Sequence, residues 1–449
     1  MKRFNRSFMT WILLFALVSG TWWIPTMAEE VFLEATREDF QKIPIWVLDF
    51  PYVGTNHTGQ LNGYQDAVDV LKADLTRSQV FAVQDLPAAR VPFPESKCLR
   101  PQILSTAAER GITASTWGRI IVGQANTASP GLIFDACAFD TGNKEFLVGK
   151  RYYSGTVSES LLRLMIHRWA DELVYRYTGE PGIAQTKIVY VSEQHRGREL
   201  FVMDYDGYGP QQVTANGFLN LMPAWHPNRR FIVYTAYRGH KQEIVQRELA
   251  SGKEDILVSA ASLNITPAFS PDGKWLAYAS ADSGNSDIFK LNMETRTIQR
   301  LTTHRSADLS PSWSPDGRHI VFTSDRGGRP QLYIMDADGN HVRRLTFQHD
   351  YNAAPAWSPR GDWIAYVCRI PRQGFKLCRI TPDGRQAVQI TKGPSIDDSP
   401  SWSPNGRHLV FSSVRRGASH IYLIHRDGTG LERITQNGTH HSSPAWSPL

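Results

Sequence analysis

The sequence lacks the features that identify several large classes of protein. Its 49 Lys and Arg exceed its 43 Asp and Glu by only six, and it has no basic run that would follow a phosphate backbone. It contains no GxSxG nucleophile elbow, no HExxH motif and no P-loop. The four cysteines form no CxxC pair, which argues against a zinc site. We therefore expect a protein that is not an enzyme and has no nucleic-acid partner, no cofactor and no bound metal.

Cysteine is scarce, and its pairing is left open by the sequence. Cys368 and Cys378 flank a predicted hairpin, where a disulfide and two free thiols are both compatible with the spacing. Cys98 and Cys137 both fall in the N-terminal half, and the sequence does not decide whether they pair. The adjacent His440 and His441 are expected to be surface histidines rather than metal ligands.

Apolar stretches of membrane length are also missing, and a short one lies close to the N-terminus. Lys2, Arg3 and Arg6 precede the apolar segment 9–18, and Thr26-Met27-Ala28 resembles a cleavage site. The pattern predicts a signal peptide over 1–28 and export of the mature chain. An uncleaved anchor is the alternative, because residues 22–25 extend the apolar stretch.

Against these absences stands one strong repeat. The phrase Pro-(Ala/Ser)-(Trp/Phe)-(Ser/His)-Pro occurs six times at intervals of 44 or 45 residues, which suits a four-stranded propeller blade. We call these phrases the anchors. They begin at Pro223, Pro267, Pro311, Pro355, Pro400 and Pro444. The aromatic residue of each anchor is expected to pack between blades rather than to form a binding platform.

The repeat also predicts how a ring would close. Each of the first five anchors is followed by a complete unit, such as strands over 319–325, 331–337 and 342–346, whereas the sixth is followed by nothing. Strand-like segments within 187–214 precede the first anchor without an anchor of their own. We therefore predict a six-bladed β-propeller over 183–449, in which 441–449 supplies the innermost strand of a composite blade.

Residues 29–180 have a different pattern, that of an α/β domain. Strands are predicted over 44–50, 80–83, 119–123, 132–139 and 145–153, and helices over 63–77, 106–110 and 158–177. A linker near Gly179–Gln185 joins this domain to the repeats. The predicted fold class is an α/β N-terminal domain followed by an all-β six-bladed β-propeller.

A polar residue stands three positions before each anchor proline. These residues are Asn220, Asn264, Asp308, Asn352, Asp397 and His441, so five of the six are Asn or Asp. Such residues hydrogen-bond their own backbone in turns, which is a structural role. Their sixfold repetition would also place a ring of polar side chains around one mouth of the tunnel, and both roles are compatible with the pattern. Whether an ion lies in that tunnel is not readable from the sequence.

Several phrases resemble the TolB family of the bacterial Tol-Pal system across nearly the whole mature chain. They are HRWADELVYRYTGEPG (167–182), MDYDGY (203–208), TSDRGGRPQLY (323–333) and the final PAWSPL. The resemblance implies a periplasmic scaffold that binds the lipoprotein Pal through one propeller face and TolA through its mature N-terminal segment. It implies a role in outer-membrane integrity and in constriction during cell division, with other envelope proteins as further partners.

The resemblance also gives expected contact residues. On the Pal-facing loops they are Leu263, Asn264, Asp308, Leu309, Asn352 and Asp397. For TolA they are Glu30, Val31, Phe32, Leu33 and Glu34, within a segment 29–40 that would switch between docked and free states. The alternative is that this segment packs on its own domain or is disordered. The alternative function is a periplasmic solute-binding or glycan-binding propeller outside the Tol-Pal pathway.

Overall fold

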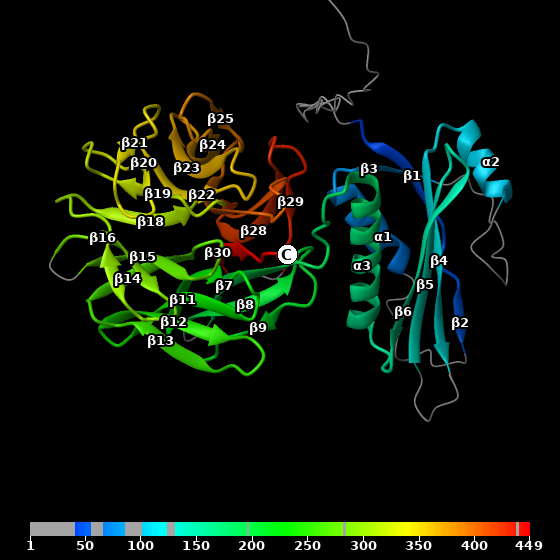
Figure 1. Ribbon diagram of the computed structural model, residues 1–449, viewed down its shortest axis with the longest axis horizontal. Coiled ribbons are helices and arrows are strands. Elements are labelled where there is room, and N and C mark those ends of the chain that lie inside the picture. The colour runs from blue at the N-terminus through cyan, green and yellow to red at the C-terminus, as the bar shows by residue number, and fades with distance from the viewer. Residues whose placement is uncertain are drawn as a thin grey trace, which may run out of the picture. The chain divides into compact units, whose positions relative to one another are not determined.

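The computed structural model describes residues 41–54, 66–85, 101–123, 131–194, 197–281, 284–436 and 440–449. The predicted signal peptide, its cleavage site and the segment 29–40 lie outside these residues. Lys42–Leu449 form one compact unit, within which a mixed α/β region precedes a series of antiparallel sheets (Figure 1).

The α/β region is built on a six-stranded mixed sheet of order β3-β1-β4-β5-β6, with β2 paired to β4. β1 pairs in parallel with β3 and β4, whereas β4, β5 and β6 are antiparallel. The elements are β1 (Ile43–Val47), β2 (Tyr52–Gly54), α1 (Ala67–Arg77), β3 (Phe81–Gln84), α2 (Pro101–Glu109), β4 (Ala114–Gly123), β5 (Gly131–Asp140), β6 (Glu145–Ser154) and α3 (Glu159–Thr178).

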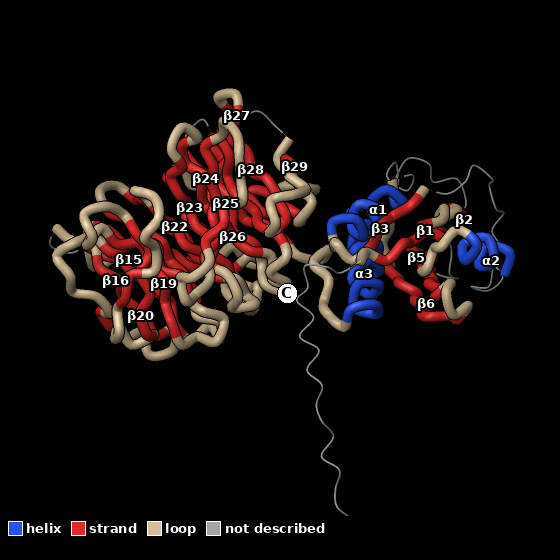
Figure 2. The backbone as a smooth tube through the Cα atoms, turned by 90° about the horizontal axis from the view of Figure 1, so that it is seen from above, coloured by secondary structure: helices blue, strands red, loops and turns tan. Residues whose placement is uncertain are grey.

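Helices cover both faces of this sheet, as Figures 1 and 2 show. On one face, α1 and α3 bury Leu71, Leu75 and Trp169 together with sheet residues such as Phe134. On the other face, Ala107 of α2 joins a smaller cluster that contains Trp117. Alternate residues of the long strands β4 and β5 point to opposite faces, so both clusters draw on the same strands.

The sequence at both ends of α3 explains its length. Ser158 is the N-cap, and its side chain accepts a hydrogen bond from the Leu161 N–H. Gly179 ends the helix in the left-handed conformation at φ 69°, where glycine carries no Cβ penalty. The helix predicted over 158–177 therefore agrees with α3 to within one residue at each end. The observed helix α1 is shorter than the helix predicted over 63–77, because it begins at Ala67.

The repeats form four sheets of four antiparallel strands each. Their strands are β14 (Leu263–Phe269), β15 (Trp275–Ala281), β16 (Asp287–Asn292) and β17 (Ile298–Arg300); β18 (Asp308–Trp313), β19 (His319–Ser324), β20 (Gln331–Asp336) and β21 (Arg343–Arg344); β22 (Asn352–Trp357), β23 (Ile364–Ile370), β24 (Gly374–Ile380) and β25 (Ala387–Gln389); β26 (Ile396–Trp402), β27 (His408–Arg415), β28 (Ala418–His425) and β29 (Glu432–Arg433). Figure 1 shows these sheets arranged around a common centre.

An eight-stranded sheet completes this arrangement and brings distant parts of the chain together. Its strands are β7 (Lys187–Gln194), β8 (Gly197–Asp204), β9 (Gln211–Gln212), β10 (Leu219–Trp225), β11 (Phe231–Arg238), β12 (Lys241–Glu248), β13 (Glu254–Val258) and β30 (His441–Trp446). One pair, Leu219 with Arg198, joins β10–β13 to the other four strands. In that second group β30 pairs antiparallel with β7, which pairs with β8.

Every anchor strand carries a bulge at the same place. The residue before each anchor proline has a φ between 48° and 54°, and the pairing register with the next strand shifts there. These residues are Met222, Thr266, Ser310, Ala354, Ser399 and Ser443. A bulge leaves an extra residue without a ladder partner, and a proline next to it has no N–H to leave unpaired. The anchor prolines therefore fit a position at which the ladder is interrupted.

The anchor tryptophans join one sheet to the next. The indole Nε1 of Trp225 donates to the Ala445 carbonyl at 3.0 Å, and that of Trp313 donates to Ala268 at 3.1 Å. Trp402 donates in the same way to Ala356 at 2.9 Å. For Trp313 and Trp402 the acceptor lies in the anchor strand of the neighbouring sheet, whereas for Trp225 it lies in β30, the anchor strand of the other half of the same eight-stranded sheet. Trp446 instead donates to the Thr186 hydroxyl at 2.8 Å.

Strands β23 and β24 carry the two cysteines whose pairing the sequence left open. Cys368 and Cys378 form a disulfide across this strand pair, with their Cα atoms 5.9 Å apart. Cys137 is also disulfide-bonded, while Cys98 lies outside the described residues. Over the described parts of the chain, no helix is long and apolar enough to cross a membrane.

The pairing of β30 with β7 predicts the effect of truncation. A chain that ends at Ser443 loses Trp446, whose side chain is buried (6% exposed). The indole N–H of Trp446 donates to the Thr186 hydroxyl, and its backbone N–H donates to the Ser401 hydroxyl. We expect the free energy of unfolding to fall by at least about 3 kcal/mol, the lower end for loss of a buried Trp side chain. Denaturant melts measure it, and removal of Leu449 alone is the control. Equal midpoints for the two truncations would contradict this role of β30.

Candidate functional site

One side of the antiparallel sheets is formed by two kinds of loop, and we call it the loop face. It comprises the hairpins between second and third strands and the segments that lead from each outer strand to the next anchor strand. Backbone hydrogen bonds hold the two kinds together: the Asn352 N–H donates to the Pro330 carbonyl at 2.9 Å, and the Asp308 N–H to Ser286 at 2.7 Å. The contact residues predicted for Pal all lie at the start of anchor strands at this face.

The structure places the four predicted polar contact residues inside the protein. Asn264, Asp308, Asn352 and Asp397 each have 0% relative exposure. The two apolar residues beside them, Leu263 and Leu309, are half-buried. The expectation that the four polar side chains face a partner is therefore revised, because their polar atoms are used within the sheets. The residues expected to contact TolA, Glu30 to Glu34, lie outside the described residues.

Each buried polar residue ties its anchor strand to the adjacent loop. Asp308 accepts two hydrogen bonds from Nη2 of Arg326, at 3.0 and 2.8 Å. Asn352 Nδ2 donates to the side chain of Gln331 at 2.9 Å and to the Gln348 carbonyl at 2.7 Å. A buried polar group that lacks a partner costs about 1–3 kcal/mol, so these bonds keep the loops in place.

The other two buried polar residues do the same. Asn264 Nδ2 donates to the carbonyls of Gln242 and Ala261, and its Oδ1 accepts from Ser280 at 2.8 Å. Asp397 accepts from Ser395 at 2.9 Å and from Ser413 at 2.6 Å. These four side chains thus have the structural role considered for the sixfold pattern, which is to hydrogen-bond the chain around them.

The exposed part of the loop face is apolar and basic. Its large exposed apolar side chains are Phe218 (39%), Leu219 (41%), Phe347 (73%), Ile396 (51%) and Val414 (37%). Its exposed cationic side chains are Arg198, Lys241, Arg305, Arg329, Arg369, Arg372, Lys392 and Arg416. Exposed carboxylates in the described part of this face are fewer: Glu193, Asp325 and Asp398. Several large exposed apolar side chains on one face are typical of an interaction surface.

Phe347 is the most exposed of these residues, and sequence reasoning missed it. It directly follows Thr346, whose hydroxyl accepts from the Leu332 N–H and so ends the outer strand. The guanidinium of Arg344 lies 4.9 Å from the Phe347 ring centre, so a cation supports one ring face. The sequence feature that could have indicated Phe347 is a large apolar residue immediately after the threonine that ends the outer strand.

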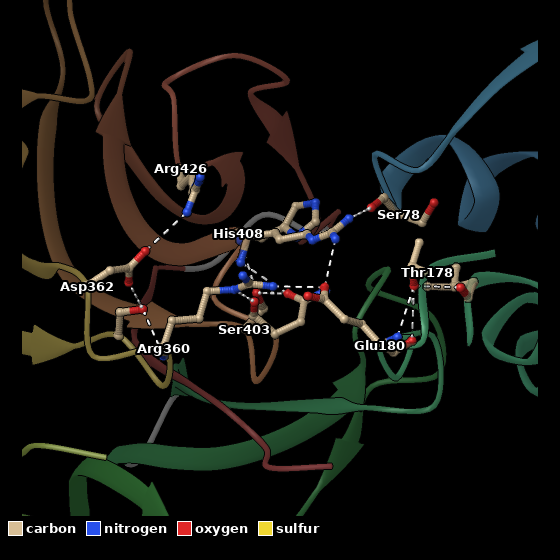
Figure 3. Close-up of polar contacts among 12 residues, drawn as sticks. Ser78, Thr178, Glu180, Arg360, Asp362, Ser403, His408 and Arg426 are labelled. Atoms are coloured by element: carbon tan, nitrogen blue, oxygen red, sulfur yellow. Dashed lines mark hydrogen bonds and ion pairs between the residues drawn. The ribbon is translucent and has the colours of Figure 1, made fainter. Parts of the chain in front are cut away.

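The opposite side of the sheets contacts the α/β region through a polar cluster, shown in Figure 3. Glu180 Oε2 binds Nη2 of Arg360 at 2.9 Å and Nη2 of Arg407 at 2.7 Å. Arg407 also donates to the Ser78 carbonyl at 3.4 Å. These contacts join the segment after α3 to the turns that follow two anchors, so this side already has intramolecular partners.

His408 is fully buried beside this cluster. Its ring centre lies 5.1 Å from that of His425 and 6.3 Å from that of Trp446. Burial, with smaller contributions from the neighbouring His425 and Arg407, lowers the pKa of His408 to about 3. The ring therefore stays neutral in the folded protein at pH values where an unfolded chain would protonate it.

A cavity of about 520 Å³ lies among the anchors. Its lining includes Trp225, Phe269, Trp313, Trp357, Trp402 and Trp446 together with anchor prolines. Four of these tryptophans are at most 8% exposed and use their indole N–H within the protein. The anchor aromatics therefore pack between sheets, as their fixed position beside proline predicts.

Sheets of antiparallel strands arranged around a centre, with anchor strands innermost, define the class of β-propeller proteins. The family model of the TolB β-propeller domain matches residues 174–449. The chain belongs to this family.

Individual relatives carry the same name. The chain is 33% identical over 260 residues to the Tol-Pal system protein TolB of Methylobacillus flagellatus, covering 57% of this chain and 55% of that protein. It is 32% identical over 229 residues to the TolB of Polaromonas naphthalenivorans, covering 51% and 48%. The chain thus aligns with about half the length of these curated relatives.

A solved structure is similar over a longer range. The crystal structure of TolB from Acinetobacter baumannii superposes with a TM-score of 0.76 at 27% identity. The match covers 91% of this chain and 97% of that one, so it includes the α/β region as well as the sheets. The predicted family and the propeller fold are confirmed.

The buried pair of Asp308 and Arg326 gives a stability prediction. Asp308→Ala leaves the guanidinium, which is only 16% exposed, without its carboxylate. We expect a loss of about 3 kcal/mol in denaturant melts, the low end for breaking a buried ion pair. The matched control is Asp325→Ala in the adjacent hairpin, which is exposed and should change stability by less than about 0.5 kcal/mol. Equal effects of the two substitutions would show that Asp308 has no special structural role.

His408 gives a prediction about pH. Its folded pKa lies below the value of about 6.5 in an unfolded chain, so only the unfolded state takes up its proton as the pH falls. Stability is therefore lost below pH 6.5, by about 2 kcal/mol between pH 7 and pH 5.

The variant His408→Phe keeps a ring in this position and removes the titration. Its stability should fall less than that of the wild type between pH 7 and pH 5, as measured by urea melts at each pH. His341→Phe is the control, because His341 is exposed and the pKa of its ring is raised by Asp336, the opposite direction. An unchanged acid slope in His408→Phe would refute the assignment.

Proposed function

We propose that this chain is a non-catalytic periplasmic scaffold of the Tol-Pal system. In this proposal a six-bladed propeller binds Pal through the loop face, and the mature N-terminal segment 29–40 binds TolA. The signal peptide over 1–28 directs export. The joint action of both partners supports outer-membrane integrity and constriction during cell division. Membership in the TolB propeller family and the names of the relatives support this role.

The blade count in this proposal depends on how the eight-stranded sheet is divided. In the strand ladder, its two four-stranded groups are joined by the one pair Leu219–Arg198, so we count them as two blades. With the four separate sheets this gives six, one for each anchor. The pairing of β30 with β7 then closes the ring with strands from both ends of the repeat region.

The observation that carries the Pal-binding proposal is the composition of the loop face. Phe347, Phe218 and Ile396 offer apolar surface, and the same face carries exposed arginines and lysines. Large rings and arginines are the residues that most often dominate protein interfaces, and the excess of cations favours a partner surface rich in carboxylates. Leu263 and Leu309 lie half-buried at the same face and contribute apolar contact beneath the loops.

A solute-binding or glycan-binding propeller remains the second candidate, and the anchors weigh against it. A sugar platform needs aromatic faces open to the ligand. The anchor tryptophans are instead largely buried, and most donate their indole N–H within the protein.

Calorimetric titration of residues 29–449 with the periplasmic domain of Pal tests the proposal. We expect saturable 1:1 binding that weakens as salt is added, because part of the attraction is between charges. Phe347→Ala should weaken binding at least about tenfold without lowering the melting temperature, since this ring is 73% exposed. Ile298→Ala, on an exposed outer strand, is the matched control.

Two further results decide the assignment. Removal of residues 29–40 should abolish TolA binding and leave a chain that still binds Pal. A folded chain that does not bind Pal would reject the proposed function. If Phe347→Ala binds Pal as tightly as the wild type, Pal would still be the partner, but the loop face would not be its binding surface.

A further inference from the structure

Three potential metal ligands meet between α3 and the end of β8. His167 comes from α3, Asp204 is the last residue of β8, and Asp206 follows in the next turn. One ring nitrogen of His167 and one carboxylate oxygen from each aspartate all lie within 4.8 Å of one another. The loop face and its proposed partner play no part in this cluster.

The histidine is oriented as a metal ligand would be. Its side chain is 3% exposed, and its Nδ1 lies 2.6 Å from the carboxylate of Asp74. The hydroxyl of Tyr205 donates to the other oxygen of Asp74 at 2.5 Å, which fixes that carboxylate. Metal-bound histidines commonly place one ring nitrogen on a carboxylate in this way, while the other nitrogen binds the ion.

The remaining nitrogen of His167 has nothing to bind within the protein. Its Nε2 is buried and is without a hydrogen-bond partner among the described residues. A buried polar atom without a partner is costly, and proteins usually avoid it. Because Nδ1 is taken by Asp74, Nε2 is the atom available to a ligand beside the two aspartates.

Two cations now neutralise the aspartates. Lys187 Nζ lies 2.6 Å from Asp204, and the lysine side chain is 52% exposed. Arg163 binds Asp206 and is 14% exposed. The flexible lysine can move into water when another cation arrives, whereas the buried arginine stays and continues to orient Asp206. Asp206 also accepts from the N–H of Tyr208 at 3.1 Å.

We propose that His167, Asp204 and Asp206 bind a divalent transition-metal ion, with Zn²⁺ as the best match. One imidazole nitrogen with two carboxylate oxygens, completed by water, is a ligand set that suits zinc. Ligands about 2.1 Å from a tetrahedral ion lie about 3.5 Å apart, so the side chains must close by about 1 Å. The ion would link α3 to β8 and so fasten the α/β region to the sheets.

The sequence could not reveal this site. His167 and the aspartates are separated by more than thirty residues, and no spacing motif links them. The expectation that the chain has no metal was drawn from motifs alone.

Zinc titration of the full mature chain tests the proposal. After treatment with a chelator and its removal, Zn²⁺ should bind with one-to-one stoichiometry in calorimetry and raise the melting temperature. Asp204→Asn should weaken binding at least about tenfold, because a carboxamide is a poor zinc ligand. Lys187→Ala should tighten it several-fold, because the competing ammonium is gone.

The matched control is another histidine–aspartate pair. His341 is 84% exposed and its Nδ1 lies 2.6 Å from Asp336, outside the proposed site, so His341→Ala removes an exposed histidine and should leave zinc binding at the site unchanged. Melts without zinc check that each variant is folded. Three results would overturn the proposal: no zinc binding by the folded wild type, equal binding by Asp204→Asn, or weaker binding by Lys187→Ala.

Discussion

The packing of each anchor strand against the next is the interaction on which the rest of the structure depends. A four-stranded sheet has two apolar faces and cannot bury both alone. The anchor tryptophans pack between neighbouring four-stranded groups, and the hydrogen bonds from Trp225, Trp313 and Trp402 to backbone carbonyls fix the rotation of one group relative to the next. Once that rotation is fixed, the loops at both ends of the sheets are fixed too, and so is the surface that they present.

The two sides of the sheets then serve different purposes. On one side, Glu180 and the arginines that it binds hold the α/β region. On the loop face, the polar residues before the anchors are turned inward, which leaves the tips to phenylalanine, isoleucine and basic residues. An inward polar ring makes the loops rigid, and a rigid surface loses less conformational entropy when a partner binds.

Much of this fold could be predicted because its signals are local or periodic. The anchors recur at a fixed interval, and Ser158 and Gly179 mark the ends of α3 within the sequence itself. The positions of strands in the repeats followed from the same regularity. These features depend on neighbouring residues, which a sequence displays directly.

The parts that could not be predicted depend on contacts between distant residues. The sequence pattern at Asp308 is the same whether the side chain faces a partner or Arg326, because the choice depends on a loop eighteen residues away. The left-handed residue before each anchor proline is not glycine, so composition gave no sign of it. The meeting of His167 with Asp204 and Asp206 depends on how α3 packs on the sheets.

The pairing of β30 with β7 has a consequence for how the protein reaches its folded state. Contacts such as that between Lys187 and Ser447 span 260 residues, and long-range pairing of this kind is slow because a large loop must close first. Until β30 docks, β7 presents an unpaired edge that another chain is able to occupy. The docking of β30 thus ends the interval during which the edge of β7 is open to aggregation, and a chaperone that covers β7 would protect the chain during that interval.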